Sequence, residues 1–91
     1  MKKALKEMPY AQATVIIDEN DNTITLRSYS TDVATIKNDW LSINGLYSMT
    51  TRKHIKAFCK EYAGFDLFST IRTIVNDRLK YNIVTGEVVP V

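Results

Sequence analysis

Apolar and polar positions alternate along the first half of the chain, and this period of two residues is typical of half-buried β-strands. The alternation is clearest over residues 23–28, where Ile24 and Leu26 fall on one face and Arg27 on the other. Strands are predicted at residues 14–17, 23–28, 33–36 and 40–47. The polar segments between them are short, so consecutive strands are expected to pair as antiparallel hairpins in a meander.

After residue 50 the spacing of apolar positions changes from two residues to the 3.6 residues of an α-helix. The apolar positions of this segment are Ile55, Phe58, Cys59, Tyr62 and Ala63. Thr50 or Thr51 is expected to cap the first backbone amides of the helix. Gly64 is expected to follow its end in a left-handed conformation.

A second apolar stripe runs from residue 67 to residue 79 and predicts another helix, with Asp66 as its N-cap. Many residues of this stripe are β-branched, so a strand is the alternative for the segment. The tail, residues 81–89, carries a Thr-Gly turn between short apolar pieces. It is expected to form either a small hairpin or a single strand at the sheet edge, with Pro90 blocking extension.

Together these elements predict one α+β domain over residues 1–91. Two C-terminal helices would pack on an antiparallel four-stranded meander sheet that gains a short terminal strand or hairpin. The covered face of the sheet would carry Ile24, Leu26, Leu41 and Ile43. Residues 1–12 are expected to be poorly ordered or to form a short N-terminal helix. Because small domains often cover exposed strand edges by pairing, a homodimer is one expected state.

Composition narrows the class of protein. The hydrophobic share of 45% and the charged share of 24% are those of an ordinary globular domain, which argues against disorder. Even the apolar run from Val15 to Ile17 is far shorter than the ~18 residues that a membrane span requires. The single cysteine, Cys59, cannot form an internal disulfide, which fits a reducing compartment. We therefore expect a cytoplasmic protein that does not enter a membrane.

The formal net charge of +2 hides an uneven distribution. Four basic residues fall in a window of the first predicted helix that contains no acid: Arg52, Lys53, Lys56 and Lys60. The rest of the chain holds eight basic and ten acidic residues. Helical spacing aligns Arg52, Lys56 and Lys60 with Lys53 beside them, so the chain carries a basic row on a weakly acidic body.

This basic row has three interpretations. It could bind the phosphates of a nucleic acid, dock on an acidic protein surface, or be the solvated face of an amphipathic helix. Like charges four residues apart weaken a helix, and the absence of an acid in the window favours a binding role. Tyr29 and Tyr47, at predicted strand ends, could extend such a site by stacking on unpaired bases, although ordinary packing explains them equally well.

No set of residues predicts catalysis, a metal site or a cofactor. His54, the only histidine, lies beside Lys53 near a helix start, so a neutral, hydrogen-bonded structural histidine is expected. Cys59 lies on the apolar stripe, where a thiol behaves as a small hydrophobic group. The acidic turn at residues 18–22 lacks the glycine and glutamate positions of an EF-hand, and the glycines are too isolated to form a phosphate loop. We therefore expect a binding protein and not an enzyme.

Two stretches of the chain resemble a known group of proteins. Residues 28–36 fit the pattern Ser-Tyr-x-Thr-x-Val-Ala-x-Ile, and residues 47–58 fit Tyr-Ser-x-Thr-Thr-x-Lys-His-Ile-x-x-Phe. Both patterns, together with the Thr-Gly-Glu-Val at residues 85–88, are similar to short, functionally uncharacterised proteins of bacteriophages, prophages and conjugative elements of Gram-positive hosts. The positions that match are Tyr29, Thr31, Tyr47, Thr50, Thr51, Lys53 and His54.

The resemblance implies a cytoplasmic accessory protein of a mobile element in a bacterial host cell, and it carries over no catalytic residue. The same residues have a structural interpretation, in which Thr hydroxyls cap the helix and His54 ties the strand end to the helix start by a hydrogen bond.

The leading hypothesis from the sequence is a small binding module that docks a basic helix on an anionic partner. The expected binding residues are Arg52, Lys53, Lys56, Lys60, Tyr47 and Tyr29. Nucleic acid is favoured as the partner, and contact without base reading is favoured because no base-reading motif is present. The alternative is a protein–protein adaptor, or an inhibitor of a host factor, whose partner is an acidic protein surface.

Overall fold

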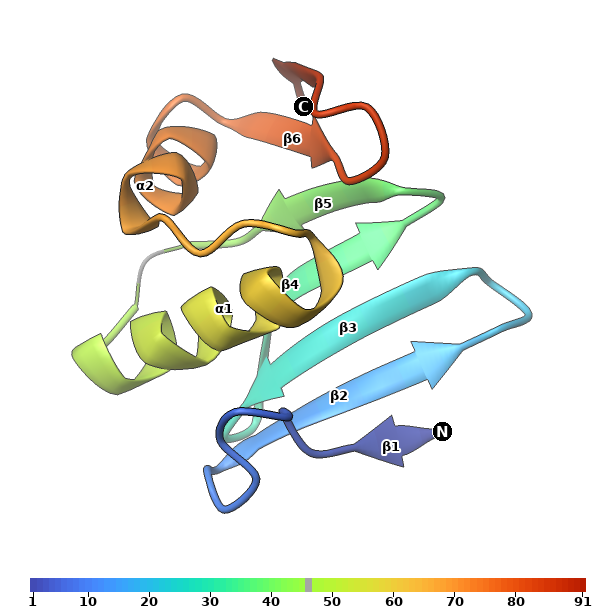
Figure 1. Cartoon of the computed structure of the whole chain (residues 1–91), viewed down its shortest axis with the longest axis vertical. Coiled ribbons are helices and arrows are strands. Elements are labelled where there is room, and N and C mark those ends of the chain that lie inside the picture. Colours follow the sequence, from blue (N-terminus) through green and yellow to red (C-terminus); the bar gives the residue numbers. More distant parts are fainter. Residues whose placement is uncertain (46) are drawn as a thin grey trace.

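A computed structural model describes residues 1–45 and 47–91 and shows an antiparallel sheet with two helices on one of its faces (Figure 1). The elements in chain order are β1 (Lys2–Lys3), β2 (Ala13–Asp18), β3 (Thr23–Ser28), β4 (Thr31–Lys37), β5 (Trp40–Ile43), α1 (Met49–Tyr62), α2 (Phe68–Asn76), β6 (Leu79–Asn82) and β7 (Val88–Pro90). The predicted α+β class is confirmed. The sheet within these residues has seven strands in the order β1 to β7, which is more than the predicted four-stranded meander with its terminal strand or hairpin.

The four predicted strands form the centre of the sheet as β2 to β5. The β2–β3 hairpin pairs Asp18 with Thr23, and the Asp18 carboxylate accepts hydrogen bonds from the two backbone amides that open the turn. The tight β4–β5 turn places Asn38 and Asp39 at φ values of 50° and 73°. Asparagine and aspartate tolerate this left-handed region better than other side chains, so the polar cluster in the sequence marks the turn correctly.

The fourth predicted strand ends earlier than residue 47. β5 stops at Ile43, and the backbone N–H of Asn44 makes the last bond on the β4 side by donating to the carbonyl of Val33. Tyr47 has a φ of 54°, which is incompatible with an extended strand. Leu46, which the prediction also included, lies outside the described residues.

The N-cap of the first helix lies two or three residues before the predicted one. Its N-cap is Ser48, whose hydroxyl oxygen accepts a hydrogen bond from the backbone N–H of Thr51 at 3.3 Å. The prediction of Thr50 or Thr51 as the cap is therefore wrong, and Thr51 instead turns its hydroxyl into the protein interior. The predicted role of Gly64 is confirmed, because Gly64 follows the helix at a φ of 81°.

The second helix is shorter than predicted. α2 starts after Leu67, which makes no side-chain capping bond, so Asp66 does not act as the N-cap. The helix ends at Asn76, and Arg78 at a φ of 53° turns the chain into β6. Residues 77–79, which were predicted to belong to this helix, therefore lie outside it. The tail forms the hairpin alternative, with β6 and β7 paired around a turn that contains Gly86 at a φ of 78°.

The N-terminal segment is ordered as part of the sheet, which corrects the expectation of a poorly ordered segment or a short helix at residues 1–12. Lys2 and Lys3 pair with Ile16 and Val15 of β2 as the edge strand β1. Leu5 then enters the core with none of its surface exposed. Two lysines carry no strand signal, so this strand depends on its pairing partner and on the burial of Leu5.

The core lies between the sheet and the two helices. α1 packs on β3, and α2 packs on β5 and β6. The predicted inner face is confirmed, with Leu26, Leu41 and Ile43 buried and Ile24 partly buried against them. Each fully buried Leu, Ile or Phe contributes about 1.5–3 kcal/mol of transfer free energy, so this layer of side chains supplies most of the driving force for folding. Neither α1 nor α2 is long and apolar enough to cross a membrane.

Candidate functional site

The apolar stripe of α1 is buried as predicted, and this fixes which way its basic residues point. Ile55, Phe58 and Cys59 are fully buried against the sheet. Lys53, Lys56 and Lys60 are therefore exposed on the opposite side of the helix, while Arg52 is half-buried. The helix thus presents the predicted basic row at the surface.

The structure divides this basic row into two parts. The ammonium group of Lys60 lies 2.6 Å from a carboxylate oxygen of Glu7, which comes from the segment between β1 and β2. The hydrogen bond and the charge of Glu7 raise the pKa of Lys60, and the charge of Asp66 adds to the effect. At this end of the helix the positive charge is compensated locally, so the field of the row is concentrated at its other end.

At the start of α1, the second helix adds a cation and an aromatic ring that sequence analysis did not assign to the site. Arg72 and Phe68 of α2 face the basic side of α1 across a groove of about 350 Å³. We call this the basic groove, and the residues that line it are Met49, Arg52, Lys53, Lys56, Phe68 and Arg72. Phe68 and Arg72 are spaced i, i+4 on one helix, which is the signal that could have found them.

Two guanidinium groups of the basic groove lie over the aromatic ring of Phe68. The central carbon of Arg52 is 5.7 Å from the ring centroid, and that of Arg72 is 5.2 Å from it. Cations at these distances from an aromatic ring are attracted by its quadrupole. The ring therefore holds two like charges near each other, and both belong to the wall of the groove.

The local backbone reinforces the positive potential. The first turn of α1 contains no acidic residue, and it is the positive end of the helix dipole. Placing Arg52 at the end of this turn costs about 0.3–1 kcal/mol of helix stability at low ionic strength. Charges placed against the dipole raise the attraction of this region for an anion.

Tyr29 and Tyr47, the two aromatic residues predicted for the site, lie outside the basic groove. Tyr29 is exposed in the β3–β4 turn, and its ring centroid is 5.9 Å from that of His54. The ring of Tyr47 lies over Gly45, where an added Cβ atom would come within 3.3 Å of it. Neither tyrosine is among the residues that line the groove.

A polar cluster, buried except at Ser48, joins the end of β3 to the start of α1, and we call it the corner cluster. It consists of Ser28, Ser48, Thr51 and His54. The Ser28 hydroxyl lies 2.8 Å from Nδ1 of His54 and 3.0 Å from the Thr51 hydroxyl, and the Ser48 hydroxyl donates to Thr51 at 3.3 Å. The bond from His54 to the strand end, expected from the structural interpretation, is present.

The corner cluster is suited to holding the two elements together. His54 is 1% exposed and Ser28 is 2% exposed, so neither side chain is accessible to a substrate. Burial lowers the pKa of His54, as expected for a histidine that stays neutral. If Nδ1 of His54 is the unprotonated ring nitrogen, it accepts a hydrogen bond from the Ser28 hydroxyl. The Thr51 hydroxyl can then donate to Ser28, and the Ser48 hydroxyl donates to Thr51.

Cys59 is also structural. Its side chain is fully buried between the helix and the sheet, and burial raises the pKa of the thiol to about 12. A thiol with this pKa is almost entirely protonated at neutral pH, and the thiolate is the nucleophilic form. Within residues 1–45 and 47–91, no three His, Cys, Asp or Glu side chains are grouped closely enough to hold a metal ion.

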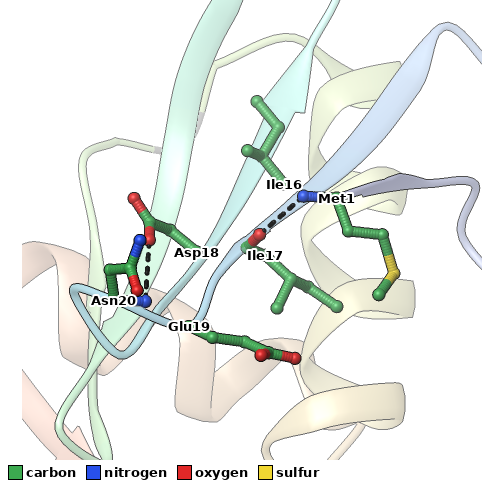
Figure 2. A pocket seen from close by; sticks show the side chains of 6 residues that line it. All are labelled: Met1, Ile16, Ile17, Asp18, Glu19 and Asn20. Carbon is green, nitrogen blue, oxygen red and sulfur yellow. Dashed lines mark hydrogen bonds between the residues drawn. The ribbon is translucent and has the colours of Figure 1, made fainter.

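Another hollow lies beside β1 and the β2–β3 turn, lined by Met1 and residues 16–20 (Figure 2). Two of its polar groups take part in hydrogen bonds within the fold. The amino group of Met1 donates to the carbonyl of Ile17 at 2.8 Å, and the Asp18 carboxylate accepts from the Asn20 backbone at 3.0 Å. These bonds hold the edge strand and the turn in place.

The fold and the groove together define a small α+β protein with a cationic, aromatic-lined surface between two helices. The chain belongs to a family of unknown function, DUF8033, whose family model matches residues 3–73. The matched range includes the corner cluster and every residue of the basic groove, and it ends before β6. No curated protein and no solved structure matches the chain.

Proposed function

We propose that this protein is a small cytoplasmic accessory module of a phage or other mobile element, which binds nucleic acid through the basic groove without reading base sequence. The observation that carries the proposal is the convergence of four cationic side chains from two helices on one groove. Nucleic acids present a regular row of phosphates, and each neutralised phosphate adds affinity through released counterions. The mobile-element origin rests on the resemblance of residues 28–36 and 47–58 to proteins of that group.

The arrangement of charges supports contact with the backbone and not with base edges. Lys53 and Lys56 are exposed, flexible point charges on α1, which suit phosphate contacts. Distinguishing all four base pairs of a duplex requires an element that enters the major groove, which is about 12 Å wide. A helix with its side chains is about 10–12 Å across, so α1 with α2 beside its basic face is too wide to enter.

A titration with one charge reversal and a matched control tests this proposal. Lys56→Glu alters the basic groove, whereas Lys37→Glu makes the same change of charge at the β4–β5 turn, on the other side of the sheet from the helices. A fluorescently labelled oligonucleotide is titrated at about 50 mM and about 200 mM salt, because affinity from phosphate contacts falls steeply over this range.

We expect wild type and Lys37→Glu to bind at low salt and Lys56→Glu to bind at least about tenfold more weakly, with a shallower salt dependence. Absence of binding to single-stranded and double-stranded DNA and RNA at low salt would reject the proposal. An equal loss in both variants would show that only the net charge matters and that the groove is not the site.

An acidic protein is the second candidate partner, and one observation favours it. Met49, in the groove lining, and Leu67, which precedes Phe68 in the chain, have 69% and 62% of their surfaces exposed. Exposed apolar side chains beside cations fit a protein surface that offers both carboxylates and apolar contacts. In this case the protein would act as an adaptor or as an inhibitor of a host factor. Leu67→Gln, which changes a residue outside the groove lining, would leave nucleic-acid affinity unchanged and weaken binding of the protein partner.

A further inference from the structure

The basic groove contains an aromatic ring, that of Phe68, besides its four cationic side chains. Such a ring bears on whether the groove binds a single strand or a duplex. Phe68 is half-buried at the start of α2, with the guanidinium groups of Arg52 and Arg72 at 5.7 and 5.2 Å from its ring centroid. Aromatic rings and planar guanidinium groups are the two protein surfaces on which unpaired bases stack. A site that bound only phosphates would require the cations but not the ring.

We propose that the ligand of the basic groove is a single-stranded nucleic acid, with its sugar-phosphate backbone along Lys53 and Lys56 and a base stacked against the Arg52–Phe68–Arg72 cluster. This inference rests on the proposed function and specifies its ligand. The two walls of the groove then have different tasks. The lysines of α1 supply affinity that depends on salt, and the planar groups of α2 with Arg52 supply affinity that depends on an accessible base.

A duplex cannot stack a base on the Arg52–Phe68–Arg72 cluster. Its bases are stacked inside the helix, and only phosphates and groove edges face a protein. α1 cannot carry the planar groups into the major groove, because Arg52 contacts Phe68 and α2 therefore lies beside the basic face of α1. A duplex would contact the lysines from outside and leave Phe68 without a base. A single strand can place an unstacked base against the ring cluster.

The size of the groove fits a short segment of a single strand. Its volume of about 350 Å³ lies near the lower end of the range of ligand pockets, about 300–1,000 Å³. Such a space admits a unit of the size of one nucleotide. At the other end of the basic row, Glu7 neutralises Lys60, so this lysine is not available to a further phosphate of the strand. The groove therefore predicts a short contact on the strand and not a long continuous track.

Substitutions at Phe68 and Arg72 separate stacking from charge. Phe68→Leu keeps an apolar side chain against the edge of the core and removes the aromatic ring. Arg72→Lys keeps the positive charge and removes the planar group, which is the property that stacks. Arg72 is exposed on α2, so Arg72→Lys leaves the core intact and provides a test that does not depend on how well Phe68→Leu folds.

The experiment compares a thymidine oligonucleotide of about 16 nucleotides with a duplex of the same length, by fluorescence anisotropy at low salt. We expect wild type to bind the single strand at least about fivefold more tightly than the duplex, since stacking of even one base has this magnitude. Phe68→Leu and Arg72→Lys are expected to weaken single-strand binding by about 5-fold to 100-fold and to leave duplex binding and the salt dependence unchanged.

The possible failures are distinguishable. Equal affinity for single strand and duplex, or single-strand affinity that both substitutions leave unchanged, would overturn the single-strand inference while the proposed function stands. Absence of binding to either probe at low salt would overturn the proposed function and this inference together. Binding only to an acidic protein partner would have the same consequence and would favour the second candidate.

Discussion

The hydroxyl oxygen of Ser28 lies 2.8 Å from Nδ1 of His54, although 26 positions separate the two residues in the chain. Ser28 ends β3, and His54 lies in the second turn of α1. Both side chains are buried, so their hydrogen bond forms in an environment where an unpaired polar group is costly. The bond fixes the start of α1, and thereby the side of the basic groove that α1 contributes, relative to the sheet.

Removing the Ser28 hydroxyl is expected to destabilise the protein. Ser28→Ala leaves Nδ1 of His54 without its partner and should lower the free energy of unfolding by about 1–3 kcal/mol. Urea denaturation measures this change, and Ser30→Ala, in the exposed β3–β4 turn, is the matched control with an expected effect within about 0.5 kcal/mol. Equal effects of the two substitutions would contradict a specific role for the corner cluster.

The stability of the protein should depend on pH through His54. Burial lowers the pKa of His54 below its ordinary value of 6.5, so the unfolded chain binds this proton more readily than the folded protein. The free energy of unfolding therefore has its full value above a pH of about 6.5 and falls as the pH drops below it, by at most about 1.4 kcal/mol per pH unit.

Urea denaturation between about pH 7.5 and pH 5 measures this dependence, in a range where ordinary carboxylates stay ionised. His54 is the only histidine of the chain, so His54→Gln should remove the slope in that range. A slope that persists in this variant would assign the effect to another group.

Neutralising Glu7 should strengthen binding to an anionic partner. Glu7 compensates Lys60 at 2.6 Å, and Glu7→Gln removes the negative charge while retaining a hydrogen-bonding side chain. One additional available cation should raise affinity for a single-stranded oligonucleotide by about 2-fold to 5-fold at low salt and make the salt dependence steeper. Glu19→Gln, in the exposed β2–β3 turn, changes net charge equally and should have a much smaller effect. An equal gain in both variants would show that Lys60 takes no part.

Gly64 should tolerate asparagine better than alanine. Its φ is 81°, and a Cβ atom there would meet no other atom within 4 Å, so the cost of a substitution is conformational and not steric. Gly64→Ala is expected to lower the free energy of unfolding by about 1–2 kcal/mol, and Gly64→Asn by less, since asparagine adopts the left-handed region more readily. Thermal unfolding of both variants tests the order, and a more stable Gly64→Ala would contradict it.

The central part of the fold could be predicted because its signals are local. Residues 23–28 alternate strictly and form β3 with the predicted bounds, and the apolar stripe of α1 is buried as its spacing indicates. β1 could not be predicted, since Lys2 and Lys3 become a strand only by pairing with β2. The predicted helix over residues 67–79 was too long because Leu79 continues the apolar spacing but belongs to β6.

For the candidate site, helical spacing predicted the exposed face of α1 but not its surroundings. Glu7 lies far from Lys60 in the chain, so a window along the helix could not reveal that this charge is compensated. Phe68 and Arg72 approach α1 only through the packing of α2 on the sheet. Phe68 also belongs to the predicted apolar stripe of residues 67–79, so its spacing indicates a core position and not a surface site. Tyr29 and Tyr47 were expected at the site from their position along the chain, and their backbone conformations direct them elsewhere.

The order of strands in the sheet equals their order in the chain, and this has a consequence for how the protein folds. From β2 to β5 each pairing closes only a short turn, so the loss of chain entropy is small at every step. The pairing of β5 with β6 is different, because it must close the whole segment that contains α1 and α2. We expect this closure to limit the folding rate, since non-local pairings slow folding most. The two walls of the basic groove would then be brought together by the slowest step of folding.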